Sequence, residues 1–171
     1  EPTTLLPIQD EVSRLSGLVQ DLHQLSLAEV GQLSLEKKPT DIKQLINRLI
    51  HMYQAEAIEQ EIILTLNDQI KQKELILHID PNRITQVLSN LLSNAFRYTK
   101  KNGTVTIQIK TDRNWLTIEI IDTGKGIEAK HIPYLFDRFY RADSDRSRNQ
   151  GGTGLGLAIA KEFIKLHGGN I

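Results

Sequence analysis

The alternation of apolar and polar residues between Asp80 and Thr99 is the most informative pattern in the chain. Apolar side chains recur there at intervals of three and four residues, which predicts a helix with one buried face. The members of this face are Ile84, Val87, Leu88, Leu91, Leu92 and Ala95. Asp80 suits the N-cap and Pro81 the first helical position. The opposite face is polar and is expected to be solvated; its members are Asn82, Ser89, Ser93 and Lys100.

A third set of side chains lies at the edge of the buried face of this helix. Its members are Arg83, Asn90, Asn94, Arg97 and Tyr98. Asn90 and Asn94 are four residues apart, so their two carboxamides lie close enough to serve one ligand. A purely solvated helix would favour Glu or Lys over amides, which are mediocre helix formers. The alternative is a helix that has two polar residues at its edge and no ligand.

The first part of the chain predicts a long helix over about residues 8–30. Its apolar residues are Ile8, Val12, Leu15, Leu18, Val19, Leu22 and Leu25. The alternating three- and four-residue spacing is typical of a helix that pairs with other helices in a bundle or dimer. The alternative is that the stripe packs on the globular part of the same chain.

The remaining patterns predict short strands and two more helices. Strands are expected at 33–36, 62–66 and 75–79, and helices from Pro39–Asp41 to Glu59 and over 157–167. A hairpin is expected around a turn at 112–114, with Val105, Ile107 and Ile109 on one strand and Leu116, Ile118 and Ile120 on the other. This order predicts an α+β fold, a two-layer sandwich of a mixed, mostly antiparallel sheet and helices, preceded by a long helix.

Composition removes several classes of function. The 171 residues include 21 basic and 21 acidic side chains, so no global field favours nucleic acid. The chain has no Cys, which excludes disulfides, thiolate zinc sites and cysteine nucleophiles. It shows neither a signal peptide nor an apolar run of membrane-spanning length. Because it starts without Met and stops just after Gly168 and Gly169, we expect a fragment of a longer protein.

Asp122 ends the second hairpin strand and is followed by the segment Thr123-Gly124-Lys125-Gly126-Ile127. An Asp at this place can simply form an Asx-turn. Alternatively, its carboxylate faces a pocket while the glycines let a ligand approach the backbone. Since a carboxylate only accepts hydrogen bonds, its natural partner is an exocyclic amine such as that of adenine.

A second glycine cluster, residues 151–156, opens the helix expected at 157–167. Free N–H groups at a helix N-terminus favour an anion, although the cluster matches neither the P-loop nor the dinucleotide fingerprint. Before it come an amphipathic stretch at 132–140 and a polar segment at 141–150. Arginines gather here: Arg138, Arg141, Arg146 and Arg148. The segment is either a mobile lid over a polyphosphate or an ordinary solvated loop.

Four short motifs, in this order and spacing, resemble those of the catalytic ATP-binding domain of bacterial sensor histidine kinases. NLLSNA resembles the N box, DTGKGI the first glycine box, LFDRFYRAD the F box and GGTGLGLAI the second glycine box. The resemblance covers about residues 33–171 and implies an ATP-binding domain truncated at its C-terminal end. Residues 1–32 resemble the second helix of the dimerisation and phosphoacceptor hairpin.

The resemblance implies roles for individual residues. Asn94 would coordinate Mg²⁺ with Asn90 beside it, Arg97 would contact phosphate, and Tyr98 would cover the adenosine. Asp122 would accept from the adenine amine. The residues implied to shape the pocket around it are Gly124, Lys125, Gly126 and Ile127. Those implied to line or reach the triphosphate are Arg138, Tyr140, Arg141, Gly152, Thr153, Gly154, Leu155 and Gly156.

The implied activity is transfer of the γ-phosphoryl of Mg-ATP to a histidine, for relay to an aspartate of a response regulator. None of the five His residues is followed by an acidic residue as in the family's acceptor motif, so the acceptor is expected on an upstream helix and autophosphorylation of this chain is not expected. Gyrase-type relatives have a glutamate where this chain has Asn90, and an amide cannot deprotonate water, so hydrolysis is expected to be slow.

The resemblance further implies a homodimer formed through the N-terminal helix and a cytoplasmic location in a membrane-anchored parent. Two alternatives share the fold. One is an anti-sigma-factor serine kinase, which the bundle-like first helix disfavours. The other is a non-catalytic ATP-binding or dimerisation module, which the intact Asn94 and Asp122 disfavour.

Overall fold

The computed structural model describes residues 5–142 and 152–171. They form two compact units. The first, which we call the helical unit, comprises residues 1–34 and 130–171; the second, the sheet unit, comprises residues 35–129. This division follows packing within each unit and does not test the predicted division into residues 1–32 and 33–171, which stays a prediction.

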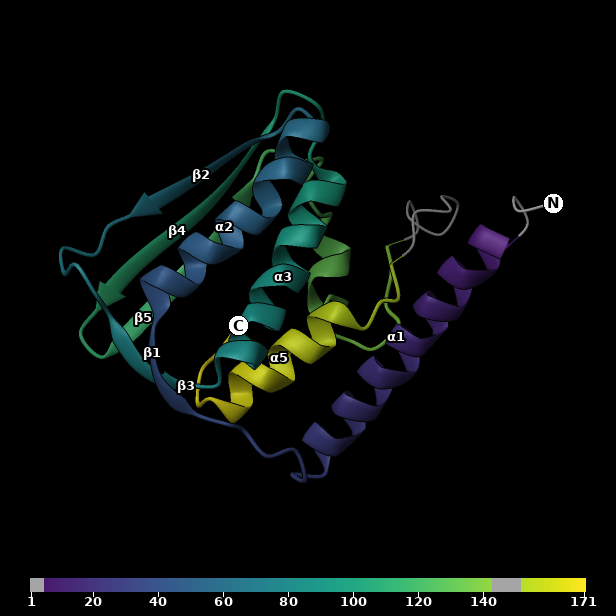
Figure 1. Ribbon diagram of the computed structural model, residues 1–171, viewed down its shortest axis with the longest axis horizontal. Helices are drawn as coiled ribbons and strands as arrows, with labels where there is room; N and C mark the ends of the chain where they lie inside the picture. The colour runs from purple at the N-terminus through teal and green to yellow at the C-terminus, as the bar shows by residue number, and fades with distance from the viewer. Residues whose placement is uncertain (1–4, 143–151) are drawn as a thin grey trace. The chain divides into compact units, whose positions relative to one another are not determined.

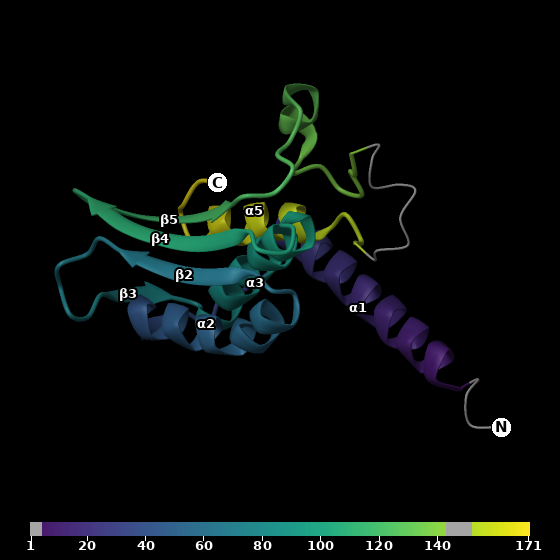
Figure 2. The same cartoon turned by 90° about the horizontal axis from the view of Figure 1, so that it is seen from above.

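The sheet unit is an α+β sandwich, as the pattern predicts. Its strands are β1 (Lys38–Asp41), β2 (Ile63–Asp68), β3 (Ile76–Ile79), β4 (Thr104–Asp112) and β5 (Trp115–Asp122). β2 pairs in parallel with β4, and β4 pairs antiparallel with β5, while β1 and β3 form a separate antiparallel ladder. The helices α2 (Ile42–Glu59) and α3 (Pro81–Tyr98) cover one face of the three-stranded sheet (Figures 1 and 2).

The expected hairpin is confirmed and supplies the centre of the core. Val105, Ile107 and Ile109 of β4 are fully buried, and they alternate with half-buried polar residues on the other face. In the register of the hairpin, Ile107 lies opposite Ile120 of β5. Strand residues two apart share a face, so the apolar face of the hairpin meets the helices as a whole.

α3 begins and ends almost where the pattern predicts. Oδ1 of Asp80 accepts hydrogen bonds from the backbone N–H groups of Asn82 and Arg83, at 3.0 and 3.1 Å. Oδ2 of Asp80 accepts from the N–H of Glu36 at 3.0 Å. The carboxylate is buried, and these donors offset the loss of its hydration. Asp80 therefore caps the helix and also holds the segment that precedes β1.

The expected solvation of Ser89 and Ser93 is wrong, because α2 covers this face. The Tyr53 hydroxyl donates to the Ser89 carbonyl at 3.2 Å and lies 3.0 Å from Ser93 Oγ. The Tyr53 ring stacks on Phe96, with 5.6 Å between the centroids. A helix beside another helix on one sheet buries two of its faces, and the small serines leave room for the tyrosine.

The strand predicted at residues 33–36 is also wrong, since the strand begins at Lys38. The N–H of Glu36 donates to Asp80 and is not part of a ladder. Pro39 lies within β1, opposite His78 of β3. A proline lacks the N–H that a central strand needs, but a two-stranded ladder has a free edge that tolerates it.

The helical unit contains α1 (Leu5–Glu29), the 3₁₀ helix η2 (Ala129–Tyr134, whose first residue belongs to the sheet unit) and α5 (Gly156–Leu166). α1 and α5 lie side by side. The single apolar stripe predicted for α1 divides into two faces. Leu25 and Ala28 are buried, whereas Val12, Leu15, Val19 and Leu22 are 57, 49, 69 and 39 % exposed. Within the described residues, no helix combines the length and the apolar character of a membrane span.

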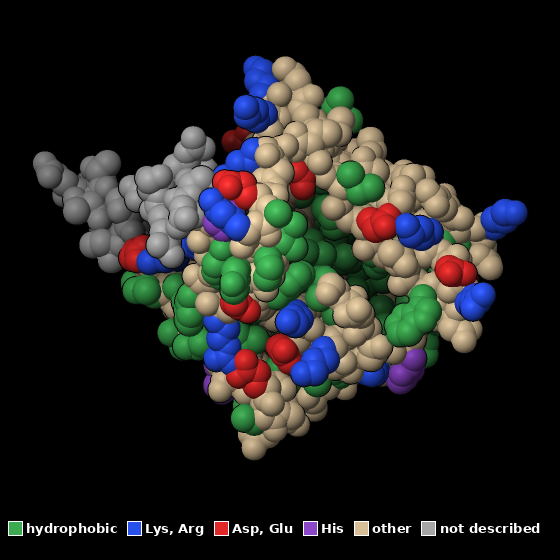
Figure 3. Space-filling view, turned by 180° about the vertical axis from the view of Figure 1, so that it is seen from behind, with side chains coloured by type: hydrophobic (Ala, Val, Ile, Leu, Met, Phe, Trp, Pro, Cys, Tyr) green, Lys and Arg blue, Asp and Glu red, His purple; other side chains and the backbone are tan. Residues whose placement is uncertain are grey.

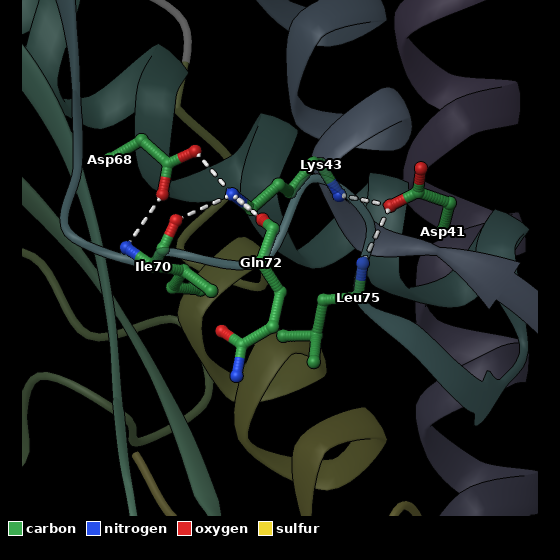
Figure 4. A network of polar contacts seen from close by, with 6 residues as sticks. All are labelled: Asp41, Lys43, Asp68, Ile70, Gln72 and Leu75. Atoms are coloured by element: carbon green, nitrogen blue, oxygen red, sulfur yellow. Dashed lines mark hydrogen bonds and ion pairs between the residues drawn. The ribbon is translucent and has the colours of Figure 1, made fainter.

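A buried lysine joins α2 to the segment between β2 and β3 (Figure 4). Nζ of Lys43 donates to the carbonyls of Ile70 and Gln72, at 2.8 and 2.5 Å, and lies 2.8 Å from Oδ2 of Asp68. Its side chain is only 11 % exposed. Partial burial raises the pKa of Asp68, but the hydrogen bonds from Lys43 and from the Ile70 amide outweigh it and lower the pKa below its ordinary value.

Replacing Lys43→Met is expected to lower the free energy of unfolding by about 1–3 kcal/mol, because two carbonyls and a carboxylate lose their donor. Urea denaturation at pH 7 measures this, and the exposed Lys73→Met on the same segment serves as the control. A depressed carboxyl pKa stabilises the fold above its ordinary value of 3.8 and ceases to do so as the pH falls through the folded-state pKa. The difference between wild type and Lys43→Met should therefore narrow from pH 7 to about pH 3; a difference that stays constant would contradict the ion pair.

Candidate functional site

The candidate site of the sheet unit is built where the end of α3, the start of β4 and the end of β5 meet. Thr104 and Thr123 join the two strands, since Thr104 N–H donates to Thr123 Oγ1 at 2.9 Å and Thr123 N–H donates to the Thr104 carbonyl at 3.1 Å. Gly103 precedes β4, and a Cβ there would lie 2.5 Å from Thr99 Cγ2 and 2.9 Å from Thr123 Oγ1. These close contacts fix the end of β5 against the end of α3.

Asp122 forms the Asx-turn that was one of its two predicted roles. Its Oδ1 accepts from the Gly124 N–H at 2.8 Å. The side chain is exposed, and within the described residues no donor is bound to Oδ2. The turn therefore fixes the carboxylate while one oxygen stays available to an amine. The two predicted roles are compatible, and the turn is what orients the acceptor.

Gly124 is required by the packing of the first glycine box on α3. A Cβ at this position would lie 2.7 Å from the carbonyl oxygen of Tyr98 and 2.6 Å from Oδ1 of Asp122. Neither atom can yield cheaply, because one is helix backbone and the other is held by the turn. Gly126 has a φ of +72°, a conformation that side chains disfavour, while Ile127 is 57 % exposed.

Lys125 and Tyr98 bring the glycine box and the amide-bearing edge of α3 together. The Lys125 ammonium lies 5.0 Å from the centroid of the Tyr98 ring, within the range of a cation–π contact. One helical turn earlier comes Asn94 and another turn earlier Asn90, about 6 and 12 Å from Tyr98 along the axis. Both amides are half-buried, and Arg97 is exposed in the last turn.

The donor set on this edge can be compared with what Mg²⁺ requires. Among the described residues there is no group of three or more His, Cys, Asp or Glu side chains that could hold a metal. Mg²⁺ usually takes few protein oxygens and completes its shell with water and phosphate. The amide oxygens of Asn90 and Asn94 fit that requirement.

The second glycine cluster lies in the helical unit. Gly154 has a φ of +72° and its carbonyl accepts from the Phe139 N–H at 2.9 Å. Thr153 Oγ1 accepts from the buried Leu155 N–H at 3.2 Å. α5 begins at Gly156, and no side chain of the described residues caps it through Leu155. Gly152 is half-buried. The binding of an anion at this helix N-terminus stays a prediction.

The arginines and the tyrosine of the F box have partners of their own. Arg138 forms an ion pair with Glu29 at the end of α1 through one nitrogen of its guanidinium, and its side chain is partly exposed. Tyr140 is half-buried, and its hydroxyl lies 2.6 Å from Nδ1 of His131. Arg141 is half-buried. The predicted lid residues Arg146 and Arg148, and Gly151 after them, lie outside the described residues.

The structure adds residues that the sequence did not single out. Thr123 and Gly103 position Asp122, and His131 holds Tyr140. The Asn102-Gly103 pair is a turn signal, and Asn102 indeed has a φ of +64°. Thr123 and His131 act through partners 19 and 9 residues away, and no local pattern marks such partners.

The surface carries both signs of charge. On the face shown in Figure 3, lysine and arginine side chains alternate with aspartate and glutamate among the coloured residues. No single-sign field covers this part of the described surface.

Comparison with protein families identifies the family of the C-terminal part of the chain. The profile of the family described as "Histidine kinase-, DNA gyrase B-, and HSP90-like ATPase" matches residues 79–171. Sensor histidine kinase WalK of Bacillus subtilis (strain 168) is 38 % identical over 172 aligned positions, which span 99 % of this chain and 28 % of the relative. Sensor protein kinase WalK of Staphylococcus aureus (strain Newman) is 36 % identical over the same share of each chain. The chain thus spans little more than a quarter of these curated relatives.

Solved structures show the same fold. Histidine kinase AdeS of Acinetobacter baumannii superposes with a TM-score of 0.77 at 27 % identity, over 96 % of this chain and 74 % of AdeS. Full-length ShkA, solved in complex with AMPPNP, superposes with a TM-score of 0.83 at 22 % identity, over 97 % of this chain and 34 % of ShkA. At that identity the second likeness concerns the fold alone.

Gly124→Ala is expected to lower the free energy of unfolding by about 1–3 kcal/mol, because the new methyl group would overlap the Tyr98 carbonyl. Thermal or urea denaturation measures the loss. Gly17→Ala is the matched control: it lies within α1, a Cβ there meets nothing within 4 Å, and helix propensity favours alanine. If Gly124→Ala unfolds no more easily than wild type or Gly17→Ala, the close packing of the glycine box on α3 is wrong.

Proposed function

This chain belongs to the family of histidine kinase-, DNA gyrase B- and HSP90-like ATPases, and from this membership we propose that it is the ATP-binding part of a sensor histidine kinase of a two-component system. The observation that supports the proposal most directly is the meeting of Asp122 and Tyr98 through Gly124 in the sheet unit. An acceptor for an exocyclic amine, an aromatic ring and a row of amides then follow one another along the end of β5 and the edge of α3.

In the proposed complex the adenine amine donates to Asp122 Oδ2, and Tyr98 covers the adenosine. Asn94, with Asn90 in the same cluster, holds Mg²⁺, which when bound neutralises charge on the phosphates. Arg97, in the last turn of α3, contacts phosphate. On grounds of sequence we extend the site to Lys125 and Ile127, and to Gly152, Thr153, Gly154, Leu155 and Gly156 with Arg138, Tyr140 and Arg141.

The proposed reaction is transfer of the γ-phosphoryl to a histidine nitrogen on a helix upstream of Glu1. The bond between Pγ and the β–γ bridging oxygen breaks, a P–N bond forms, and ADP leaves. Asn90 supplies no base that could activate water, so the residues of this chain bind and orient the phosphoryl group while hydrolysis stays slow. The phosphoryl group then passes to an aspartate of a response regulator.

The exposed face of α1 supports a proposal about assembly. Val12, Leu15 and Val19 form an exposed apolar face of α1, together with Ser16, Gln20 and His23. We propose that a second copy of the helix covers this face in the full-length protein, which would be a homodimer. In that protein the chain would be the cytoplasmic part of a membrane-anchored sensor.

A nucleotide titration tests the site. Asp122→Asn should weaken the binding of both ADP and a non-hydrolysable ATP analogue about tenfold or more, since the adenine amine loses a charged acceptor. Asn94→Ala should weaken binding in Mg²⁺ and change it little in EDTA. Calorimetry measures both effects.

Matched controls exist on the same hairpin and the same helix. Asp112→Asn at the other end of the hairpin and Asn82→Ala in the first turn of α3 are both exposed, and neither should change affinity. A chain that binds no adenine nucleotide, with or without Mg²⁺, would refute the proposed function. Equal loss for Asn94→Ala in Mg²⁺ and in EDTA would refute the metal role alone.

A further inference from the structure

His131 is a buried polar residue for which the proposed function has no use so far. It lies in η2, is 8 % exposed, and its Nδ1 lies 2.6 Å from the hydroxyl of Tyr140. The ring centroids of the two residues are 6.1 Å apart. Among the described residues Tyr140 is the hydrogen-bond partner of His131, so we expect His131 to act on the site through Tyr140.

Tyr140 is held in two further ways. Its ring packs against Tyr134, with 5.6 Å between the centroids and 34° between the planes. Its backbone N–H donates to the Asp137 carbonyl at 3.3 Å. The hydroxyl, the ring and the backbone of this residue are therefore each in contact with a different neighbour.

The residue before Tyr140 is fixed as well. Phe139 has a φ of +60°, a conformation that a bulky residue rarely adopts. Its N–H donates to the Gly154 carbonyl at 2.9 Å, and a Cβ on Gly154 would lie 2.8 Å from Phe139 Cα. The two backbones thus meet at a distance that only glycine allows. The unusual conformation of Phe139 is therefore supported by its contact with Gly154.

We propose that His131 is a positioning residue of the nucleotide site, which holds Tyr140 and thereby the adjacent Arg141 in place. The inference rests on the proposed function, in which Tyr140 and Arg141 reach the phosphates. A phenol donates one hydrogen only. If Tyr140 gave it to His131, the hydroxyl would offer a phosphate only lone pairs. The nucleotide complex therefore requires the tautomer in which Nδ1–H of His131 donates to Tyr140, so that the phenolic O–H is free to donate to a phosphate oxygen.

The experiment combines nucleotide affinity with the tautomer of His131, both on the whole chain. Tyr140→Phe removes only the hydroxyl, and His131→Leu removes the donor at similar size. Each should weaken the Mg²⁺-bound ATP analogue about fivefold to tenfold, and the double variant should be no weaker than either single one, because all lose the same chain of hydrogen bonds. His131→Asn, whose amide can donate from nearly the place of Nδ1, should restore most of the affinity.

Nitrogen-15 NMR supplies a readout that a purely structural role would not move. With the ATP analogue and Mg²⁺ bound, Nδ1 of His131 should show the shift of a protonated ring nitrogen, and Tyr140→Phe should abolish the change that nucleotide produces there. His167→Leu is the control, because its Nδ1 is bonded to the Phe163 carbonyl in α5 and its loss should leave affinity unchanged.

The outcomes are distinguishable. Wild-type affinity in every His131 and Tyr140 variant, or losses that add in the double variant, would overturn the positioning role and leave the proposed function standing. A wild-type chain that binds no adenine nucleotide would overturn both. If His131→Leu does not fold, Tyr140→Phe and His131→Asn carry the comparison, and an unprotonated Nδ1 in the complex would overturn the role by itself.

Discussion

The contact on which the candidate site depends is the one between Gly124 and the last carbonyl of α3. A side chain at position 124 would collide with Tyr98 and with Asp122 at once, so the strand end can approach the helix end only through a glycine. That approach brings a carboxylate oriented by its own Asx-turn beside an aromatic ring. Since α3 is rigid, the amides of Asn90 and Asn94 then stand at fixed distances from both. The absence of a side chain at Gly124 thus determines the spacing between the carboxylate, the aromatic ring and the amides.

α3 meets three different environments, and this explains its composition. One face packs on the sheet through residues such as Leu92, a second receives Tyr53 of α2 between two serines, and the remaining edge carries the amides. Its N-terminus is fixed by Asp80, which is also bonded to the Glu36 N–H. A helix held on two faces and at its cap cannot easily shift along its axis. This rigidity is what a site that depends on the relative position of Asn94 and Asp122 requires.

Local patterns predicted the elements, and contacts distant in sequence decided the details. The bounds of α3 and of the hairpin followed from apolar periodicity and from the Asp-Pro start signal, because both depend on neighbouring residues. The solvated face assigned to Ser89 and Ser93 was wrong because its cover, Tyr53, comes from another helix. The strand expected at 33–36 was wrong because Asp80 takes the N–H of Glu36. For the site, residue types at motif spacing indicated Asp122 and Asn94, whereas Thr123 and His131 depend on partners that only the fold supplies.

The two faces of α1 show how one helix can serve two purposes without conflict. Leu25, Ala28 and Glu29 lie near its C-terminal end, where the first two are buried and Glu29 is paired with Arg138 of the same unit. The exposed apolar residues Val12, Leu15 and Val19 lie earlier and along another face. Because the spacing of three and four residues is the same for both sets, periodicity merges them into one stripe. Their exposed fractions separate the two sets. The exposed set has the length and the regular spacing that pairing with a second helix requires. A second helix that packs on the exposed face need not disturb the ion pair of Arg138. Pairing through α1 and the geometry of the F box can therefore change independently of each other.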